Sequence, residues 1–176
     1  MNYLDEIKRG MDLLASYDAI FVGQAVKYPG TGITHQLTGY PNQLLEMPVA
    51  EEFQMGLCIG LALTGKLPVC IYPRSNFAIL AMNQIVNHLD KWEEMGGGAT
   101  KVIIKIAVGS SSPLDPGQQH KANYAQGFRD MCENIDVHDL IYPHMVYDSY
   151  NKALMSSKSS ILIEHADLYA FTTNNH

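Results

Sequence analysis

Short apolar runs alternate with segments of helical period along this chain. The runs cover residues 19–23, 67–72, 102–108 and 160–164. Segments of helical period flank them at 2–16, 50–65, 75–95, 119–132 and 146–156, and 136–142 reads as a further extended stretch. Strands that are apolar on both faces must be covered on both faces, and a helix commonly connects parallel strands. The pattern therefore predicts an α/β fold, with a mostly parallel sheet and helices on both faces.

The length of the chain suits one domain. It has 176 residues, 47% of them hydrophobic, which is enough for a core of its own. No repeat or low-complexity linker divides it, so we expect one domain over residues 1–171 and a frayed tail over 172–176. The helix over 50–65 is expected to stop at Gly65, because glycine readily takes the left-handed conformation that follows a helix.

The net charge and the cysteine content limit the classes of binding partner and the cellular compartment that we expect. The net charge is -6 and no Lys or Arg run is present, which argues against a nucleic acid or an anionic membrane as partner. Glycine and polar residues break the longest apolar runs, so no membrane-spanning helix is expected. Cys58, Cys70 and Cys132 stand apart in the sequence, and the N-terminus lacks a signal-peptide pattern. These features predict a cytoplasmic location.

Parallel sheets bind ligands beyond the carboxyl ends of their strands. In this chain the loops that follow the first three predicted strands are 28–40, 73–76 and 109–120, and they carry the least ordinary chemistry of the sequence. We therefore look for a functional site among these loops and the helices that begin there.

Glu51 stands just before a very apolar, glycine-spaced helix. A carboxylate in that place is expected to be largely removed from water and to need a partner that holds its charge or shares its proton. The simpler interpretation is an acidic residue that stabilises a helix N-terminus by ~0.3–1 kcal/mol. Glu52 suits that simpler role better, since one of two adjacent acids tends to face outward.

His120 and Phe77 are two further candidates, each with a structural alternative. His120 follows Gly117-Gln118-Gln119 and either donates and accepts protons near neutral pH or simply bonds a loop carbonyl. Phe77 follows Arg74-Ser75-Asn76 and either joins the core or presents a flat face to a heterocycle. No metal site is expected, because the histidines lack ligand spacing, and no phosphate loop or dinucleotide fingerprint is present.

Several short motifs occur in a set order. Gly23-Gln24 ends an apolar run, the stretch 47–51 ends in Glu51, small residues space the next helix, and Asn76-Phe77, Gln119-His120 and the run 161–164 follow. Together they resemble the beta subunit of thiamine-diphosphate-dependent 2-oxo acid dehydrogenases and, more loosely, the pyrimidine-binding domain of transketolases. That family has Gly-Glu-Asp-Val at the first motif, Thr-Pro-Ile-Ser-Glu at the second and Gln-His at the fifth, where this chain has Gln119-His120. The resemblance implies the thiamine-diphosphate-binding pyrimidine-domain fold.

The resemblance assigns roles to the candidates. It implies that Glu51 hydrogen-bonds the pyrimidine nitrogen N1′ of thiamine diphosphate and so promotes loss of the proton from the thiazolium carbon. Phe77, beside Asn76, would stack on the aminopyrimidine. His120 would face the substrate and assist proton transfer. The family usually has an arginine near Ile106-Ala107, and Arg74 could supply a nearby positive charge instead.

Two departures from the family define the expected assembly. The chain has no Gly-Asp-Gly motif followed by a distant Asn, the motif that holds magnesium and the cofactor diphosphate. A diphosphate-binding alpha subunit that holds Mg2+ is therefore implied, in an α2β2 heterotetramer. The family's C-terminal domain has no counterpart before His176, so the chain resembles one half of a split enzyme.

The expected function is activation of thiamine diphosphate for C–C bond cleavage or formation at a carbonyl, on a small carbonyl or 2-oxo acid substrate. A transketolase-like or carboligase-like transfer is favoured because the C-terminal domain has no counterpart. The alternatives are the beta subunit of a 2-oxo acid dehydrogenase, a noncatalytic interaction subunit with the same fold, and an unrelated flavodoxin-like binding domain.

Overall fold

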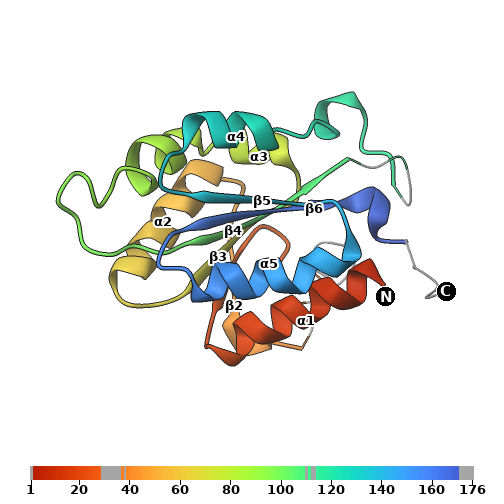
Figure 1. Cartoon of the computed structure of the whole chain (residues 1–176), viewed down its shortest axis with the longest axis horizontal. Helices are drawn as coiled ribbons and strands as arrows, with labels where there is room; N and C mark the ends of the chain where they lie inside the picture. The colour runs from red at the N-terminus through yellow and green to blue at the C-terminus, as the bar shows by residue number, and fades with distance from the viewer. Residues whose placement is uncertain (1, 29–36, 38, 110, 112–113, 171–176) are drawn as a thin grey trace.

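The protein is a three-layer α/β structure around one six-stranded sheet (Figure 1). The computed structural model describes residues 2–28, 37, 39–109, 111 and 114–170. All strand pairs are parallel, in the order β2-β1-β3-β4-β6-β5. The strands are β1 Ile20–Gly23, β2 Leu44–Glu46, β3 Pro68–Tyr72, β4 Ile103–Val108, β5 Asp136–Leu140 and β6 Ser160–His165. The predicted α/β class with a parallel sheet is confirmed.

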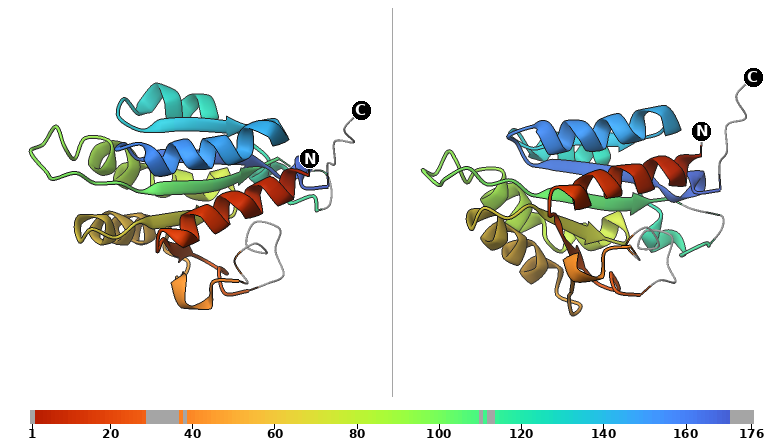
Figure 2. Two further views of the ribbon diagram at one scale, coloured as in Figure 1. Left: turned by 60° about the horizontal axis from the view of Figure 1, so that its bottom comes forward. Right: turned by 90° about the horizontal axis from the view of Figure 1, so that it is seen from below.

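Helices cover both faces of the sheet, as predicted (Figure 2). Helices α1 (Tyr3–Ser16) and α5 (Pro143–Met155) lie together on one face, and α2 (Glu51–Leu63), α3 (Ser75–Ile79) and α4 (Ala125–Met131) lie on the other. Short helical segments complete the list: Pro41–Gln43, Asn83–Leu89, Gln118–His120 and Ala166–Leu168. Within the described residues, no helix combines the length and apolar character needed to cross a membrane.

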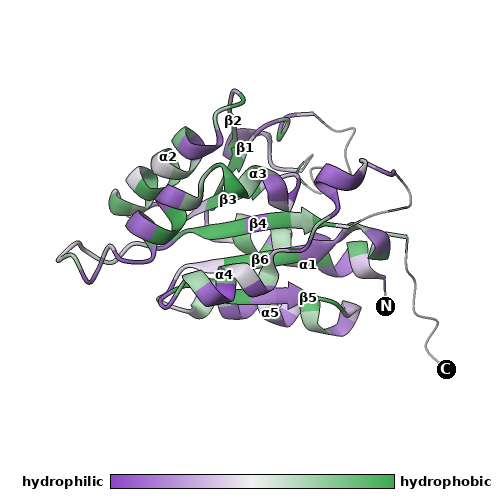
Figure 3. Ribbon diagram, turned by 90° about the horizontal axis from the view of Figure 1, so that it is seen from above, coloured by the Kyte–Doolittle hydropathy of each residue, from purple (hydrophilic) through white to green (hydrophobic). Residues whose placement is uncertain are grey.

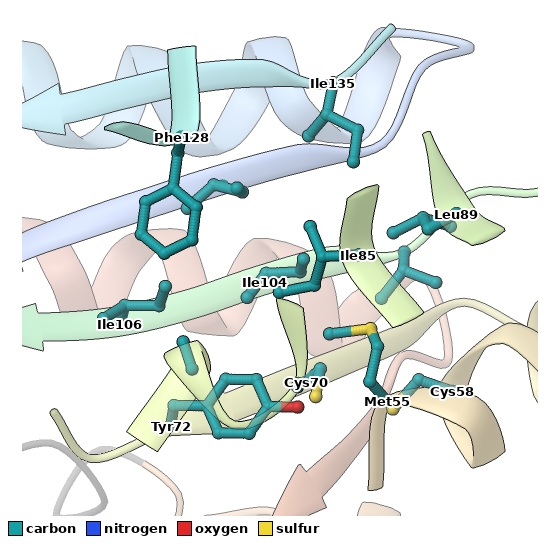
Figure 4. Packing of buried hydrophobic residues seen from close by; sticks show 14 of the residues in the cluster. Met55, Cys58, Cys70, Tyr72, Ile85, Leu89, Ile104, Ile106, Phe128 and Ile135 are labelled. Atoms are coloured by element: carbon teal, nitrogen blue, oxygen red, sulfur yellow. The ribbon is translucent and has the colours of Figure 1, made fainter. Parts of the chain in front are cut away.

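Each layer has its own apolar core. On the α2 side, the core joins the inward face of the sheet to α2, α3 and α4 (Figure 4). Cys58 of α2 and Cys70 of β3 both lie in this core, although they are distant in the sequence. All three cysteines are free and buried. The central strands β3 and β4 are mostly green in Figure 3, as expected for strands buried on both faces, whereas edge strand β5 is largely purple.

Helix α2 begins and ends where the sequence indicates. Gly65 has φ +80°, its N–H donates to Ala62 at 2.9 Å, and the N–H of Lys66 donates to Leu61 at 3.2 Å. This paired pattern uses carbonyl groups that the last turn of a helix leaves free. The prediction that the helix stops at Gly65 is confirmed.

The predicted helix over 75–95 is wrong as a single element. Helix α3 ends at Ile79, a π-helical segment spans Asn83–Leu89, and turns continue to Gly96. Buried Ala81, Ile85 and Leu89 are spaced by four residues, which is more than the ~3.6 residues in one α-helical turn. The wider π turn, marked by the bond from the N–H of Asp90 to Ile85 at 2.9 Å, lets these three side chains keep one face.

The predicted helix over 119–132 is also interrupted. A 3-10 turn at Gln118–His120 is followed by an irregular stretch, and α4 starts only at Ala125. The carbonyl of Lys121 accepts from the N–H of Gly109 at 3.2 Å, and that of Ala122 accepts from the hydroxyl of Ser75. Because these carbonyls bond other loops, they are not available to a continuous helix.

Strand β2 was not predicted, because three residues carry too little periodicity to detect. The tail 172–176 and most of the loop 28–40 lie outside the described residues, so the predicted tail and that loop stay predictions.

Candidate functional site

Glu51 is the first residue of α2 and is almost completely buried, with 6% of its surface exposed. Its Oε1 accepts a hydrogen bond from Nε2 of Gln24 at 3.1 Å. Its backbone carbonyl accepts one from the hydroxyl of Tyr72 at 2.9 Å. The predicted burial of this carboxylate is confirmed.

Glu52 has the opposite environment, as expected for the outward-facing member of the pair. Its exposed carboxylate accepts from Nδ2 of Asn83 at 3.0 Å and from Nε2 of Gln84 at 3.3 Å. The bonds from Asn83 and then Gln84 lower the pKa of Glu52. Glu52 is therefore a surface acid that joins α2 to the π-helical segment.

Tyr72, at the carboxyl end of β3, fixes the start of α2. The side chain is fully buried, and burial raises the pKa of its hydroxyl far above the ordinary value. The hydroxyl therefore stays protonated and donates to the Glu51 carbonyl. Helix α2 is thus held against the end of β3 at the residue that carries the buried carboxylate.

The two carboxylate oxygens of Glu51 differ in their hydrogen-bond partners. Among the described residues, none donates a hydrogen bond to Oε2. A buried carboxylate with one neutral donor fits a group that brings its own N–H or shares a proton, such as the ring nitrogen of an aminopyrimidine. The residues present therefore fit the pyrimidine end of thiamine diphosphate.

Asn76, Phe77 and His120 form a second cluster, from the loops that follow β3 and β4. Nδ1 of His120 lies 3.0 Å from Oδ1 of Asn76, and the ring centroids of His120 and Phe77 are 5.4 Å apart. His120 thus bonds a side-chain amide rather than the loop carbonyl considered from the sequence. Since Oδ1 can only accept, Nδ1 carries the proton, and Nε2 of the neutral ring can accept one.

Arg74 connects the same two loops. Its Nη1 donates to the carbonyl of Gly109 at 2.6 Å, just beyond the end of β4. The guanidinium is half-buried and is held by a backbone carbonyl, and within the described part of the chain it forms no ion pair with a carboxylate. Arg74 can therefore contribute positive charge at this edge of the sheet.

The candidates share the carboxyl edge of the sheet, where β1, β3 and β4 end. The turn at 118–120, drawn in blue-green, projects from that edge in Figure 1. Asn76, Phe77 and His120 touch one another, whereas Glu51 is linked to them through Tyr72, four residues before Asn76. The described residues contain no group of three or more His, Cys, Asp or Glu side chains that could hold a metal.

Two residues of the site were missed from the sequence. Gln24 was noted only as the end of a motif, and Tyr72 only as the end of a strand. The usable signal for both was position, because each lies where a parallel strand meets its loop.

This geometry defines an α/β domain with a parallel sheet and a buried acid at the carboxyl edge of the sheet. The solved structure of a split-gene transketolase, described as an inactive beta4 tetramer, has a TM-score of 0.68 and 15% identity, and the match covers 94% of this chain and 51% of that one. The likeness confirms the predicted fold.

Curated relatives add a sequence relationship. The pyruvate dehydrogenase E1 component subunit beta of Cyanidium caldarium is 27% identical over 130 residues, which are 72% of this chain and 38% of the relative. The same subunit of Rickettsia bellii (strain RML369-C) is 32% identical over 85 residues, or 48% of this chain and 26% of the relative. The chain thus spans less than half the length of these relatives. No family model matches it. The resemblance to E1 beta subunits drawn from the motifs is confirmed.

Proposed function

We propose that this chain is the pyrimidine-binding subunit of a two-component thiamine-diphosphate enzyme. The observation that carries the proposal is Glu51, a residue 6% exposed, whose carboxylate accepts from one neutral donor among the described residues. Its place at the start of α2 agrees with the motif resemblance and with the transketolase-like fold.

Each site residue has a definite task in this proposal. Glu51 holds the ring nitrogen N1′ of the pyrimidine and shares a proton with it. Phe77 offers an aromatic face to the pyrimidine ring. His120, with its Nδ1 proton directed to Asn76, uses Nε2 to exchange a proton with the substrate oxygen. When bound, thiamine diphosphate supplies a thiazolium carbon that becomes nucleophilic toward a carbonyl.

In this proposal a second chain holds the diphosphate and Mg2+, because the sequence contains no Gly-Asp-Gly motif. The outer face of α2 supports docking of that chain. Phe53 and Leu63 of α2 are 62% and 44% exposed, and Val49, which precedes the helix, is 80% exposed. On the same face a Cβ at Gly60 would meet no atom within 4 Å, which leaves room for the backbone of another helix to approach. In this proposal two such pairs of chains form the assembly, an α2β2 heterotetramer.

The reaction is C–C bond cleavage or formation next to a carbonyl. We favour transfer to a carbonyl acceptor, of the transketolase or carboligase type. The curated relatives support a second candidate equally, the beta subunit of a 2-oxo acid dehydrogenase. A noncatalytic subunit with the same fold is the third.

Reconstitution with a diphosphate-binding chain tests the proposal. The assembled enzyme with thiamine diphosphate and Mg2+ should consume a 2-oxo acid or ketose, and Glu51→Gln should reduce the rate at least about a hundredfold, the usual scale for a proton-transfer group. Glu52→Gln is the matched control and should keep the rate. Undiminished activity in Glu51→Gln would overturn the assignment. Product analysis then separates transfer to an aldehyde from reduction of a lipoyl group.

A further inference from the structure

Gln24 is the one described side chain that hydrogen-bonds the carboxylate of Glu51. Its Nε2 lies 3.1 Å from Oε1. The amide nitrogen of Gln24 can only donate, so Oε1 of Glu51 is kept as an acceptor. A proton shared by Glu51 with a ligand must then sit on the ligand side, at Oε2.

The loop after β1 holds Gln24 in place. The N–H groups of Ala25 and Lys27 donate to the carboxylate of Glu46 at 2.6 Å and 2.9 Å, and Ala25 has φ 56°, in the left-handed region. Gly23 has no room for a side chain, since a Cβ there would lie 2.7 Å from the carbonyl oxygen of Ile71. The backbone around Gln24 is thus held in a fixed turn, and this turn sets the direction of the Gln24 side chain.

The residue type at position 24 matters because it determines the charge beside the Glu51 carboxylate. This chain has a neutral amide at position 24, beside the carboxylate of Glu51. A carboxyl group at this distance from Glu51 would compete for the same proton, because two adjacent carboxylates resist being charged together. With Gln24, the charge of Glu51 is stabilised by a donor that never titrates.

We propose that Gln24 is a positioning residue, which assigns Oε1 of Glu51 to acceptance and Oε2 to proton exchange with the bound pyrimidine. The role rests on the proposed function, but the hydrogen bond and its effect on Glu51 belong to this chain alone. Gln24 acts through Glu51 and has no part in the chemistry itself.

The test is a titration of the full chain without cofactor. The carboxyl carbon of Glu51, labelled with 13C and assigned by its loss in Glu51→Gln, is followed by NMR as the pH changes. In Gln24→Met the carboxylate loses its donor, and in Gln24→Glu it gains a like charge, so both variants should take up the Glu51 proton at a pH higher by about one to three units. Gln84→Met removes a donor to exposed Glu52 and is the matched control, with an unchanged Glu51 signal.

Gln24→Glu keeps the size of the side chain, so it remains informative if Gln24→Met fails to fold. A Glu51 signal that titrates as in the wild type in either folded variant would overturn the proposal. In the reconstituted holoenzyme, the acidic limb of the pH–rate profile should move in the same direction in Gln24→Glu. If the NMR shift appears but the assembled protein binds no thiamine diphosphate, the proposed function fails while the effect of Gln24 on Glu51 stands.

Discussion

The ammonium of Lys105 lies 2.8 Å from Oε2 of Glu164, and neither side chain has any exposed surface. Two tyrosines also hydrogen-bond the Glu164 carboxylate: the hydroxyl of Tyr150 donates to Oε1 at 2.6 Å, and that of Tyr169 donates to Oε2 at 3.0 Å. Burial raises the pKa of both phenols well above the ordinary value, so they remain donors. The group joins β4, β6, α5 and the turn after β6.

Removing one partner of this buried pair should be costly. Lys105→Met leaves the Glu164 carboxylate without its cation, and we expect the free energy of unfolding to fall by about 3–5 kcal/mol. Lys105→Met with Glu164→Gln should recover a substantial part of that loss, because a neutral amide can still accept from the tyrosines. Urea unfolding of the single and double variants measures both. If the free energy of unfolding lost in the double variant equalled the sum of the losses in the two single variants, the prediction would be wrong.

Gly10→Ala should destabilise the layer formed by α1 and α5. A Cβ at Gly10 would lie 2.4 Å from Cγ of Tyr150, whose ring is held by Glu164 and cannot easily move. We expect a loss of about 1–3 kcal/mol in urea unfolding, as for overpacking of a filled core. Gly127→Ala in α4 is the control, since its Cβ would meet only Cε of Met131, at 3.7 Å. That variant should be unchanged or slightly more stable.

The sequence predicts the layers of this fold and the burial of Glu51, because apolar runs and their spacing report directly on burial. It predicts the helix over 75–95 poorly, because a spacing of four residues fits an α-helix and a π turn almost equally well. It does not reveal the Lys105–Glu164 pair, because the two residues meet only when β4 and β6 pair. The lysine inside an apolar strand was the available signal. The bond from Gln24 to Glu51 depends in the same way on how β1 and α2 come together.

Gly60→Leu should have opposite effects on the chain and on its assembly. In the isolated chain a Cβ at this position meets no atom within 4 Å. Replacing glycine there raises helix propensity and should stabilise the chain by up to about 1 kcal/mol. The side chain would, however, hold a docked helix of the partner away from α2. We therefore expect a higher unfolding temperature for the isolated chain together with at least about a tenfold weaker association with the diphosphate-binding chain, measured by calorimetry.

Gly127→Leu on α4 is the control for association and should leave the affinity unchanged. If Gly60→Leu bound the partner as tightly as the wild type, the outer face of α2 would not be the docking surface.

The stability of the protein should fall between about pH 7 and pH 5 in part because of His138 in β5. Burial is the largest cause that lowers the pKa of His138 below the ordinary histidine value of 6.5. Below that value the unfolded chain binds a proton that the folded chain does not, so acid favours unfolding and the stability returns as the pH rises above it. His138→Gln should flatten this part of a stability–pH curve from urea unfolding. An unchanged slope would show that other groups set it.

The two edges of the sheet give the isolated chain a particular solution behaviour. Edge strand β2 has only three residues, and edge strand β5 carries Asp136 and Asp139, the latter bonded to His165 at 2.6 Å. Short or charged edges resist pairing with strands of other molecules. A surplus of this subunit over its partner should therefore associate through the apolar face of α2, into oligomers that dissociate on dilution, rather than through strand pairing into fibres. Balanced synthesis of the two chains would then matter for yield more than for solubility.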